Sequence, residues 1–566
     1  MQVRDSLDVM EDDHQRDQST STAGKTTRRS YVRLLGAVGL GGALTGVAAT
    51  GSQSGVAAAQ SNGNGTGSAG GIRVSDSGTM VGDDVAQLDF GASFSATESG
   101  SDTVTVGSET NPNIVNVRED LGVEPEGDDL WAAIEDHYTS FEPTDRNHCY
   151  EIPAGTWHVE TDNIHFDAHE FLGIVGAPFA VLEVADQDVD RLMTVGSLDA
   201  SLPHAQRTVM RDLQVDIRGD YDAGIARWFT YRYGHMENIS MRGKRDKFNP
   251  QYGGDRHTIL VDGVRPSTTN VISGCHLNNG DTKYDRSTHV GHAIPFSSDV
   301  YNHGTNYWEG CQVSGYIDNG IYVSGDDGRN IVTGCHVRNC AGASIRIGPN
   351  DHVQDCQITM TEHPGFPWSG LWLENGGGQL VSQLLVNNQI KKDTEIVRLT
   401  QDGPARLTDV HITDEGTDGR AIRVNDNDDA PTAFDGCTIT DRSSPSTADY
   451  AVYVRSSNVS FDDCEFDIAP QSSTDRHGVF VTDGGDDLDR LTLENCTIDA
   501  DGASLRFAES GADHTVESSF FEGLVMSDPE TTLSSVLWTG NRHRGETAFR
   551  GERSQWQGDF NFGFDV

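Results

Sequence analysis

The stretch Ile272-Ser-Gly-Cys-His-Leu277 contains a six-residue phrase, apolar-x-x-Cys-x-apolar, that recurs along the chain at intervals of 17 to 36 residues. Between successive copies lies a second short apolar segment, for example Gly320-Ile-Tyr-Val323 or Ala343-Ser-Ile-Arg-Ile347. In the clean copies the cysteine slot is occupied by Cys275, Cys311, Cys335, Cys356, Cys437, Cys464 and Cys496. In degenerate copies we assign the slot to Leu213, Ile239, Asn388, Val410, Ser519 and Val536.

A repeat of about 25 residues with short strands, many turns and no helical period is typical of a solenoid. One repeat cannot bury its own apolar face, but stacked repeats can, with each strand pairing in parallel with its counterpart one coil along. The variable interval indicates loops of different length between strands that keep their register. The sequence therefore predicts an all-β, right-handed parallel β-helix of about 13 coils, roughly 60 Å long.

The composition indicates an acidic protein with a thin core. The chain has 63 glycines, 35% hydrophobic residues and a net charge of −46. Residues 1–59 carry equal numbers of acidic and basic groups, so the excess lies beyond them, and only six lysines occur in the whole chain. Such a surface suits very high salt, where screening removes self-repulsion. We expect a halophilic protein, and the charge disfavours nucleic acid as a partner.

The N-terminus resembles a twin-arginine export signal. Thr27-Arg-Arg-Ser-Tyr-Val-Arg33 precedes an uncharged stretch that runs to about Ala49, and Ala57-Ala-Ala59 offers a small-residue cleavage site. With the acidic composition, this resembles an exported protein of the haloarchaeal type, which implies a secreted or cell-surface location and no transmembrane segment in the mature chain. The expected organisation is a signal region at 1–59, a linker at 60–71, a small β module at 72–115, the β-helix at 116–540 and a C-terminal cap or tail at 541–566.

Seven of the nine cysteines share one slot of the repeat. Disulfides are the usual expectation for an exported protein, but a shared slot favours an inward stack of small apolar side chains. No Cys-x-x-Cys pair occurs, so we do not expect these cysteines to bind metal.

A helix and a strand precede the repeats. Residues 128–138, Asp-Asp-Leu-Trp-Ala-Ala-Ile-Glu-Asp-His-Tyr, form an amphipathic pattern with Leu130, Ile134 and Tyr138 on one face, and Tyr150-Glu-Ile-Pro-Ala-Gly-Thr-Trp157 follows. This combination resembles the N-terminal cap of the pectate lyase-like β-helix superfamily. The resemblance covers residues 116–540 and implies that the helix closes one end of the solenoid. It indicates the fold and not the activity, because the superfamily includes lyases, hydrolases, epimerases, tailspikes and non-catalytic surface proteins.

The second apolar segment of each coil predicts an outward ladder. When the flanking apolar residues point inward, the residue between them points outward. In successive coils this position is occupied by Tyr322, Arg346, Trp372, Arg398, Arg423, Tyr453, Phe480 and Arg506. Aromatic rings stack on sugars and Arg holds carboxylates or sulfates, so the outward ladder is a candidate substrate-binding site for a polysaccharide. Alternatively, these residues are good exposed-strand formers that stack on one another.

A local basic segment, 227–247, precedes two long coil intervals and is a candidate catalytic region. β-Elimination from a uronate needs a cation to neutralise the carboxylate and a base to take the C5 proton. Lys244, Arg245 and Lys247 are candidates for the cation, and His257, Tyr284 and His292 are candidates for the base. The alternative is a set of loops held by local salt bridges.

Adjacent carboxylates give a third candidate site, at Asp326 and Asp327. Such pairs can bind Ca²⁺ or act as acid and base in hydrolysis, although in a chain this acidic they also arise as solvated surface groups. The leading hypothesis is a lyase that cleaves an anionic, uronate-containing polysaccharide, with either no cofactor or Ca²⁺. The alternatives are a non-catalytic glycan-binding adhesin module and a glycoside hydrolase that uses an Asp pair.

Overall fold

The computed structural model divides the chain into two units, Met1–Asn111 and Pro112–Val566. In the first unit it describes five strands, which form an antiparallel sheet in the order β3-β2-β1-β5-β4. They are β1 (Ala57–Gln60), β2 (Ile72–Asp76), β3 (Thr79–Val85), β4 (Phe94–Glu98) and β5 (Thr103–Ser108). In the second unit it describes residues 112–184, 189–198, 204–217, 223–243, 257–278, 294–298, 301–316, 318–323, 327–361, 369–390, 394–417, 419–425, 430–444, 449–469, 476–482, 488–528, 531–544 and 547–548.

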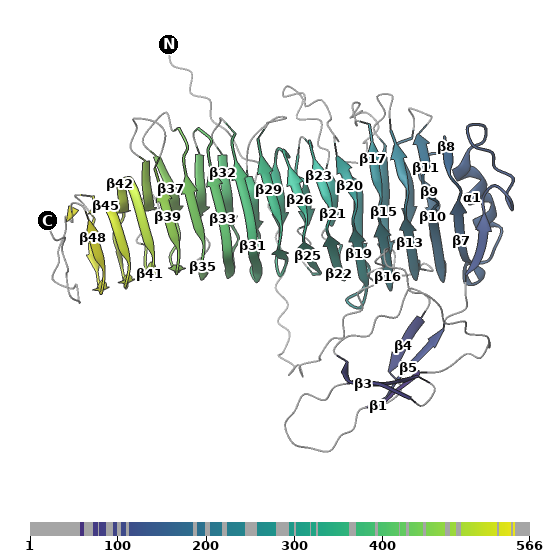
Figure 1. Ribbon diagram of the computed structural model, residues 1–566, viewed down its shortest axis with the longest axis horizontal. Coiled ribbons are helices and arrows are strands. Elements are labelled where there is room, and N and C mark those ends of the chain that lie inside the picture. Colours follow the sequence, from purple (N-terminus) through teal and green to yellow (C-terminus); the bar gives the residue numbers. More distant parts are fainter. Residues whose placement is uncertain are drawn as a thin grey trace, which may run out of the picture. The chain divides into compact units, whose positions relative to one another are not determined.

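The second unit is a right-handed parallel β-helix, which confirms the predicted fold class. Its strands stack coil upon coil from the cap helix towards the C-terminal strands, as Figure 1 shows. Each coil contributes a strand to each of three faces, which we call faces A, B and C.

Face A carries the outward ladder. Its strands are β9 (Ile164–Phe166), β12 (Arg191–Val195), β15 (Gly224–Thr230), β18 (His257–Gly263), β21 (Ile294–Ser298), β24 (Ile321–Val323), β27 (Ala343–Ile347), β30 (Ser369–Glu374), β32 (Thr394–Thr400), β34 (Gly419–Val424), β37 (Asp449–Val454), β40 (Arg476–Val481), β49 (Thr547–Ala548) and the C-terminal parts of β42 (Thr497–Phe507) and β45 (Phe520–Ser527).

Face B follows face A in each coil. Its strands are β6 (Asn113–Asn116), β7 (Asn147–Ile152), β10 (Phe171–Gly176), β13 (Arg207–Arg211), β16 (Tyr233–Glu237), β19 (Thr269–Ser273), β22 (Thr305–Glu309), β25 (Arg329–Thr333), β28 (His352–Gln354), β35 (Thr432–Asp435), β38 (Val459–Asp462), β41 (Thr492–Glu494), β44 (Thr515–Glu517), β47 (Leu537–Thr539) and the N-terminal parts of β31 (Gln379–Asn388) and β33 (Ala405–Asp414). The solenoid therefore begins at β6, inside the range that the sequence assigned to the small module.

Face C completes the coil. Its strands are β8 (Gly155–Val159), β11 (Ala180–Val184), β14 (Gln214–Asp216), β17 (Ser240–Arg242), β20 (His276–Asn278), β23 (Gln312–Ser314), β26 (His336–Arg338), β29 (Gln357–Met360), β36 (Thr438–Asp441), β39 (Glu465–Ile468), β48 (Arg542–Arg544) and the remaining parts of β31, β33, β42 and β45. Two further short strands, β43 (Gly511–Ala512) and β46 (Leu533–Ser534), pair with each other.

The bend from face B to face C is made by one residue per coil with a positive φ, a conformation that Gly, Asn and Asp adopt most readily. In successive coils these residues are Asp212, Asn238, Gly274, Gly310, Gly334, Asp355, Gln383, Asp409, Gly436, Asp463, Asn495, Ser518 and Gly540. The residue after the bend turns inward and fills the cysteine slot of the repeat. In the phrase apolar-x-x-Cys-x-apolar, the first two residues therefore end a face B strand and the third makes the bend. The cysteine fills the inward slot, and the last two residues begin a face C strand.

Two slot assignments from the sequence are wrong. Leu384, and not Asn388, aligns with Val410 in the next coil. At the C-terminal end, Ser519 aligns with Asn541 and not with Val536, because Phe520 pairs with Arg542. In both regions the chain contains two similarly spaced apolar segments, and only the strand pairing decides which of them makes the bend.

The slot residues form the predicted inward stack of thiols. All nine cysteines are free, and all except half-buried Cys149 are buried. The thiols donate hydrogen bonds to carbonyls one coil earlier, as from Cys335 to Trp308 O at 3.3 Å. Beside them runs a buried amide ladder, in which Asn270 donates to Asn306 and Asn306 to Asn330 at 2.9 and 3.0 Å.

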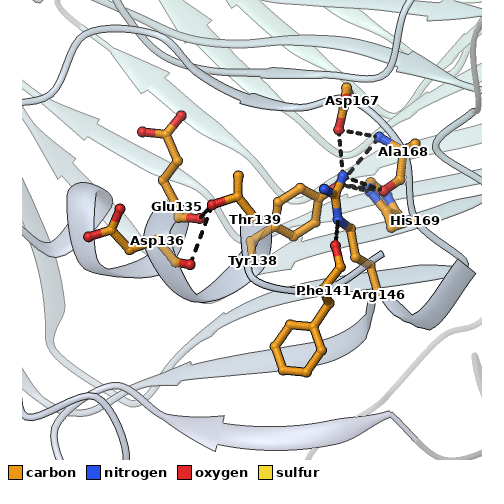
Figure 2. Close-up of polar contacts among 9 residues, drawn as sticks. All are labelled: Glu135, Asp136, Tyr138, Thr139, Phe141, Arg146, Asp167, Ala168 and His169. Carbon is orange, nitrogen blue, oxygen red and sulfur yellow. Dashed lines mark hydrogen bonds and ion pairs between the residues drawn. The ribbon is translucent and has the colours of Figure 1, made fainter. Parts of the chain in front are cut away.

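The predicted cap helix is present as α1 (Leu130–Thr139), followed by a 3₁₀ turn, η1 (Pro143–Asp145). The Asp129 carboxylate caps the helix by accepting from the Trp131 N–H, and Leu130, Trp131, Ile134 and Tyr138 are buried. Figure 2 shows how Arg146 ties this cap to the first coils. Its guanidinium group lies 4.4 Å from the Tyr138 ring centroid and donates to the Asp167 carboxylate at 2.7 Å.

The cap also holds a neutral histidine. His169 contacts the Tyr138 hydroxyl at 3.0 Å and the Thr208 hydroxyl at 2.8 Å. Burial, with a smaller contribution from Arg146, lowers the pKa of His169 to about 3. The helix therefore closes this end of the core through hydrogen bonds to a neutral histidine and through the Arg146–Asp167 ion pair. Within the described residues, no helix is long and apolar enough to cross a membrane.

Candidate functional site

The outward ladder occupies consecutive strands of face A, from β24 to β42, of which Figure 1 labels β32, β37 and β42. The pairing places Tyr322 beside Arg346, Arg346 beside Trp372 and Trp372 beside Arg398. It continues in register through Arg423, Tyr453, Phe480 and Arg506. The same row extends back through Ser297 and Leu260 to Arg227. The eight residues therefore form one unbroken line on one face, but Phe480 is buried beneath Tyr450 and not exposed as predicted.

Neighbouring members of the outward ladder stack on one another. The guanidinium carbon of Arg346 lies 4.4 Å from the Tyr322 ring centroid and 3.9 Å from that of Trp372. Arg398 lies 4.3 Å from the centroid of the same indole. Cation–π contacts of this kind stabilise the stacked arrangement of these side chains. Self-stacking, the alternative left open by the sequence, therefore exists in the structure.

Two glutamates that sequence reasoning missed hold the arginines. The buried Glu374 carboxylate pairs with Arg346 Nη2. Glu395 pairs with Arg423 and lies 3.4 Å from Arg398 Nε and 3.7 Å from Arg420 Nη1. Glu395 is thus shared by three guanidinium groups. Since these glutamates sit outside the row of the outward ladder, the coil-to-coil spacing gave no signal for them.

The C-terminal end of the outward ladder forms an aromatic group. The rings of Tyr450 and Phe480 are parallel, with centroids 3.8 Å apart, and His477 stacks on Tyr450 at 5.0 Å. Arg506 donates to both oxygens of Asp528, at 2.9 and 2.8 Å, and to the Tyr450 hydroxyl at 2.6 Å. The hydrogen bonds to Asp528 raise the pKa of Arg506. Both Tyr450 and Asp528 were missed, because they also lie outside the row.

The candidate catalytic loops fall largely outside the described residues, which include neither Lys244, Arg245 and Lys247 nor Tyr284 and His292. His257 is described: it begins β18 on face A and pairs in register with Ile294.

The basic segment 227–247 does not form one patch among its described members. Arg227 lies in the row of the outward ladder on face A, Arg232 in the turn between β15 and β16, and Arg242 at the end of β17 on face C. A coil turns through three faces within about 25 residues, so a charge cluster in the sequence is spread around the solenoid.

The candidate metal site is only partly described. Asp326 lies outside the described residues, whereas the Asp327 carboxylate is exposed and lies 3.4 Å from His303 Nδ1. Within the described part of the chain, no group of three or more His, Cys, Asp or Glu side chains is arranged to hold a metal ion.

Another set of carboxylates, which the sequence did not single out, lies in register on face C. Asp467 pairs with Asp499, and Asp499 with Glu522, on successive coils. Partial burial, together with the charges of Glu522 and Asp467, raises the pKa of Asp499. Strands one coil apart are separated by about 4.8 Å, just below the about 5–5.5 Å between the two carboxyl groups of a retaining glycosidase.

Comparison with known proteins places the chain among β-helices. A family model for the right-handed β-helix region matches residues 297–381, which include the first three residues of the outward ladder. A search of curated proteins found no match.

Several solved structures are similar to this chain at low sequence identity and with TM-scores below 0.5. The surface protein and adhesin PfbA of Streptococcus pneumoniae is 10% identical, with a TM-score of 0.35 and coverage of 79% of this chain and 99% of PfbA. The catalytic domain of a GH87 α-1,3-glucanase in complex with nigerose is 11% identical, with a TM-score of 0.34 and coverage of 82% and 72%. Tailspike protein 3 of bacteriophage CBA120 is 9% identical, with a TM-score of 0.32 and coverage of 80% and 62%. At these identities the likeness concerns the fold alone.

Proposed function

We propose that this protein binds an extended polysaccharide along the outward ladder of face A. The observation that supports this most directly is the unbroken line of eight aromatic and arginine side chains on consecutive strands. Eight positions at about 4.8 Å per coil span about 34 Å, the reach of several sugars in an extended chain. Side chains of this kind supply apolar contact and charged hydrogen-bond donors, which hydroxyl- and anion-rich ligands need.

Cleavage of the bound polymer by β-elimination is the second part of the proposal. Residues 243–256 connect β17 to β18, and residues 279–293 connect β20 to β21. Both β18 and β21 lie on face A, and their residues Leu260 and Ser297 belong to the row of the outward ladder. The segments that carry Lys244, Arg245, Lys247, Tyr284 and His292 therefore lead into the strands that precede Tyr322. This order supports a catalytic region beside one end of the binding line.

Export and high-salt operation belong to the same proposal. The twin-arginine motif at the N-terminus and the net charge of −46 support a secreted or surface protein that works in concentrated salt. A requirement for Ca²⁺ is tested in the same experiment.

The test is to incubate the full-length protein in multimolar salt, with and without Ca²⁺, with uronate-containing and neutral polysaccharides. Ultraviolet absorbance of the new C=C bond, reducing-end release and binding are followed together. Trp372→Ala is expected to weaken binding of the polysaccharide. A triple variant, with Lys244, Arg245 and Lys247 each replaced by Ala, is expected to abolish the new absorbance while binding persists. Reducing ends without absorbance would reject elimination in favour of hydrolysis. Binding without turnover would leave a non-catalytic glycan-binding module, and no binding to any polymer would reject the proposal.

A further inference from the structure

Trp372 is sandwiched between two arginines. The guanidinium carbons of Arg346 and Arg398 lie 3.9 and 4.3 Å from its ring centroid. One arginine is one coil before the indole and the other is one coil after it, so they cover its opposite faces. A sugar ring therefore cannot lie flat on Trp372, and the indole N–H already donates to Thr400 Oγ1 at 2.8 Å. Polar recognition at this point depends on the guanidinium groups, and the edge of the indole offers apolar contact.

Arg346 and Arg398 also keep the most hydrogen-bonding capacity among the ladder arginines. In the described part of the chain, the guanidinium group of Arg506 is engaged at three nitrogen atoms and that of Arg423 at two. Arg346 and Arg398 are each held by a glutamate at one nitrogen. Their side chains are 21% and 24% exposed, and because Nε of each is buried, the terminal N–H groups are the ones that a ligand can reach.

The positive charge around Trp372 is incompletely compensated. Arg398 and Arg423 share the single carboxylate of Glu395. Burial lowers the pKa of Arg398, and although Glu395 and Glu374 oppose this, the charges of Arg423 and Arg346 act in the same direction as burial. On a chain with a net charge of −46, three arginines that share the one carboxylate of Glu395 form a local attractor for an oxyanion.

The spacing of the two arginines suggests which polymer fits. Arg346 and Arg398 are two coils apart, or about 10 Å along the solenoid, and the rise of one coil is close to the length of one sugar in an extended chain. We infer that the outward ladder recognises a polysaccharide that carries a carboxylate or a sulfate ester on every second sugar. Successive anions bind Arg346 and Arg398, and the uncharged sugar between them contacts the edge of Trp372. This inference rests on the proposed function and names its ligand class.

The experiment compares four polymers by titration calorimetry with the full-length protein in multimolar KCl. They are one backbone carboxylated on alternate sugars, the same backbone sulfated on alternate sugars, a uniform polyuronate and the neutral backbone. At least one alternating polymer is expected to bind about tenfold tighter than the neutral backbone, and the two alternating polymers distinguish carboxylate from sulfate recognition. Arg346→Gln and Arg398→Gln are each expected to weaken that binding about tenfold. Arg346→Lys retains the positive charge but cannot make the bidentate hydrogen bonds of a guanidinium group, so its affinity is expected to lie between those of the wild type and Arg346→Gln.

The matched control is Arg406→Gln. Arg406 lies in the face B part of β33, away from the outward ladder, and pairs with Asp435. This variant is expected to bind like the wild type, and thermal unfolding verifies that every variant is folded. Unchanged binding by both Gln variants, equal binding of the neutral backbone, or tighter binding of the uniform polyuronate would overturn the inference. If one of these results occurs but Trp372→Ala still loses binding, the proposed function stands and only the inference fails. If the wild type binds none of the four polymers, the inference and the proposed function both fail.

Discussion

Arg476 and Asp441 form an ion pair in the interior of the β-helix, with Arg476 Nε 2.8 Å from Asp441 Oδ2 and both side chains fully buried. Asp414, which pairs in register with Asp441, lies 3.7 Å from Arg476 Nη2 through its own carboxylate. Two acids stacked on adjacent coils thus meet one arginine, which also donates to Gly419 O at 2.6 Å. The arginine is what allows both acids to remain inside.

Removing the arginine is expected to destabilise the fold strongly. Arg476→Met keeps much of the side-chain volume but leaves two buried carboxylates without a cation. Breaking a buried pair in this way costs about 3–5 kcal/mol. Denaturant unfolding measures the loss. The matched control, Arg406→Met, breaks a pair in which Arg406 is 59% exposed, and such pairs contribute about 0–1 kcal/mol. A similar effect of the two substitutions would contradict this reasoning.

The same cluster gives a pH-dependent stability. Burial and the neighbouring Asp441 raise the pKa of Asp414 to about 6, from 3.8 for an ordinary aspartate. The folded state then binds this proton more tightly than the unfolded chain, so its contribution to the free energy of unfolding is fully present below pH 3.8 and is lost as the pH rises to about 6. Relative to Asp414→Asn, the wild type should lose stability over this range. Parallel stability curves for the two proteins, from denaturant unfolding at each pH, would exclude the assignment.

Salt should stabilise the protein because acids lie in register on face B. Asp435 pairs with Asp462, Asp462 with Glu494 and Glu494 with Glu517 on successive coils. Like charges directly opposite each other destabilise a sheet by about 0.2–1 kcal/mol per pair, and salt screens them. We expect the free energy of unfolding to rise steadily with KCl, and Glu494→Gln to raise stability at low salt and reduce this dependence. A stability that is flat or falls with KCl would refute the halophilic interpretation.

The thiols should be unreactive in the folded protein. Burial and contacts between stacked thiols raise the pKa of Cys311, Cys335 and Cys356 well above that of an ordinary cysteine, and burial raises the pKa of Cys149 to about 11. A hydrogen bond with Cys464 lowers the pKa of Cys496 instead, but this thiol is buried and closed to a reagent. A disulfide reagent at pH 8 is therefore expected to modify none of the nine cysteines before unfolding and all nine after it. Rapid modification of native protein would show that the stack opens.

The sequence predicts the parts of the structure that repeat. The solenoid, the cap helix and the inward thiols follow from periodicity, and the row through Arg346 and Trp372 follows from strand alternation at a regular coil spacing. Contacts between side chains that occupy different positions in the coil cannot be predicted from this periodicity. Glu395 is a single glutamate in a very acidic chain, and only the strand pairing reveals that three arginines converge on it. Conversely, Arg232 and Arg242 are close in sequence but lie on different sides of a coil.

The bends with positive φ have a consequence for how such a protein can change. Each coil carries its own bend residue, from Asp212 to Gly540, so no coil depends on a distant segment to turn the corner. Duplicating one coil would lengthen the molecule by about 4.8 Å and add one more position to face A. Under the proposed function, the number of sugars that contact face A can then change one coil at a time, independently of the side chains that each coil presents.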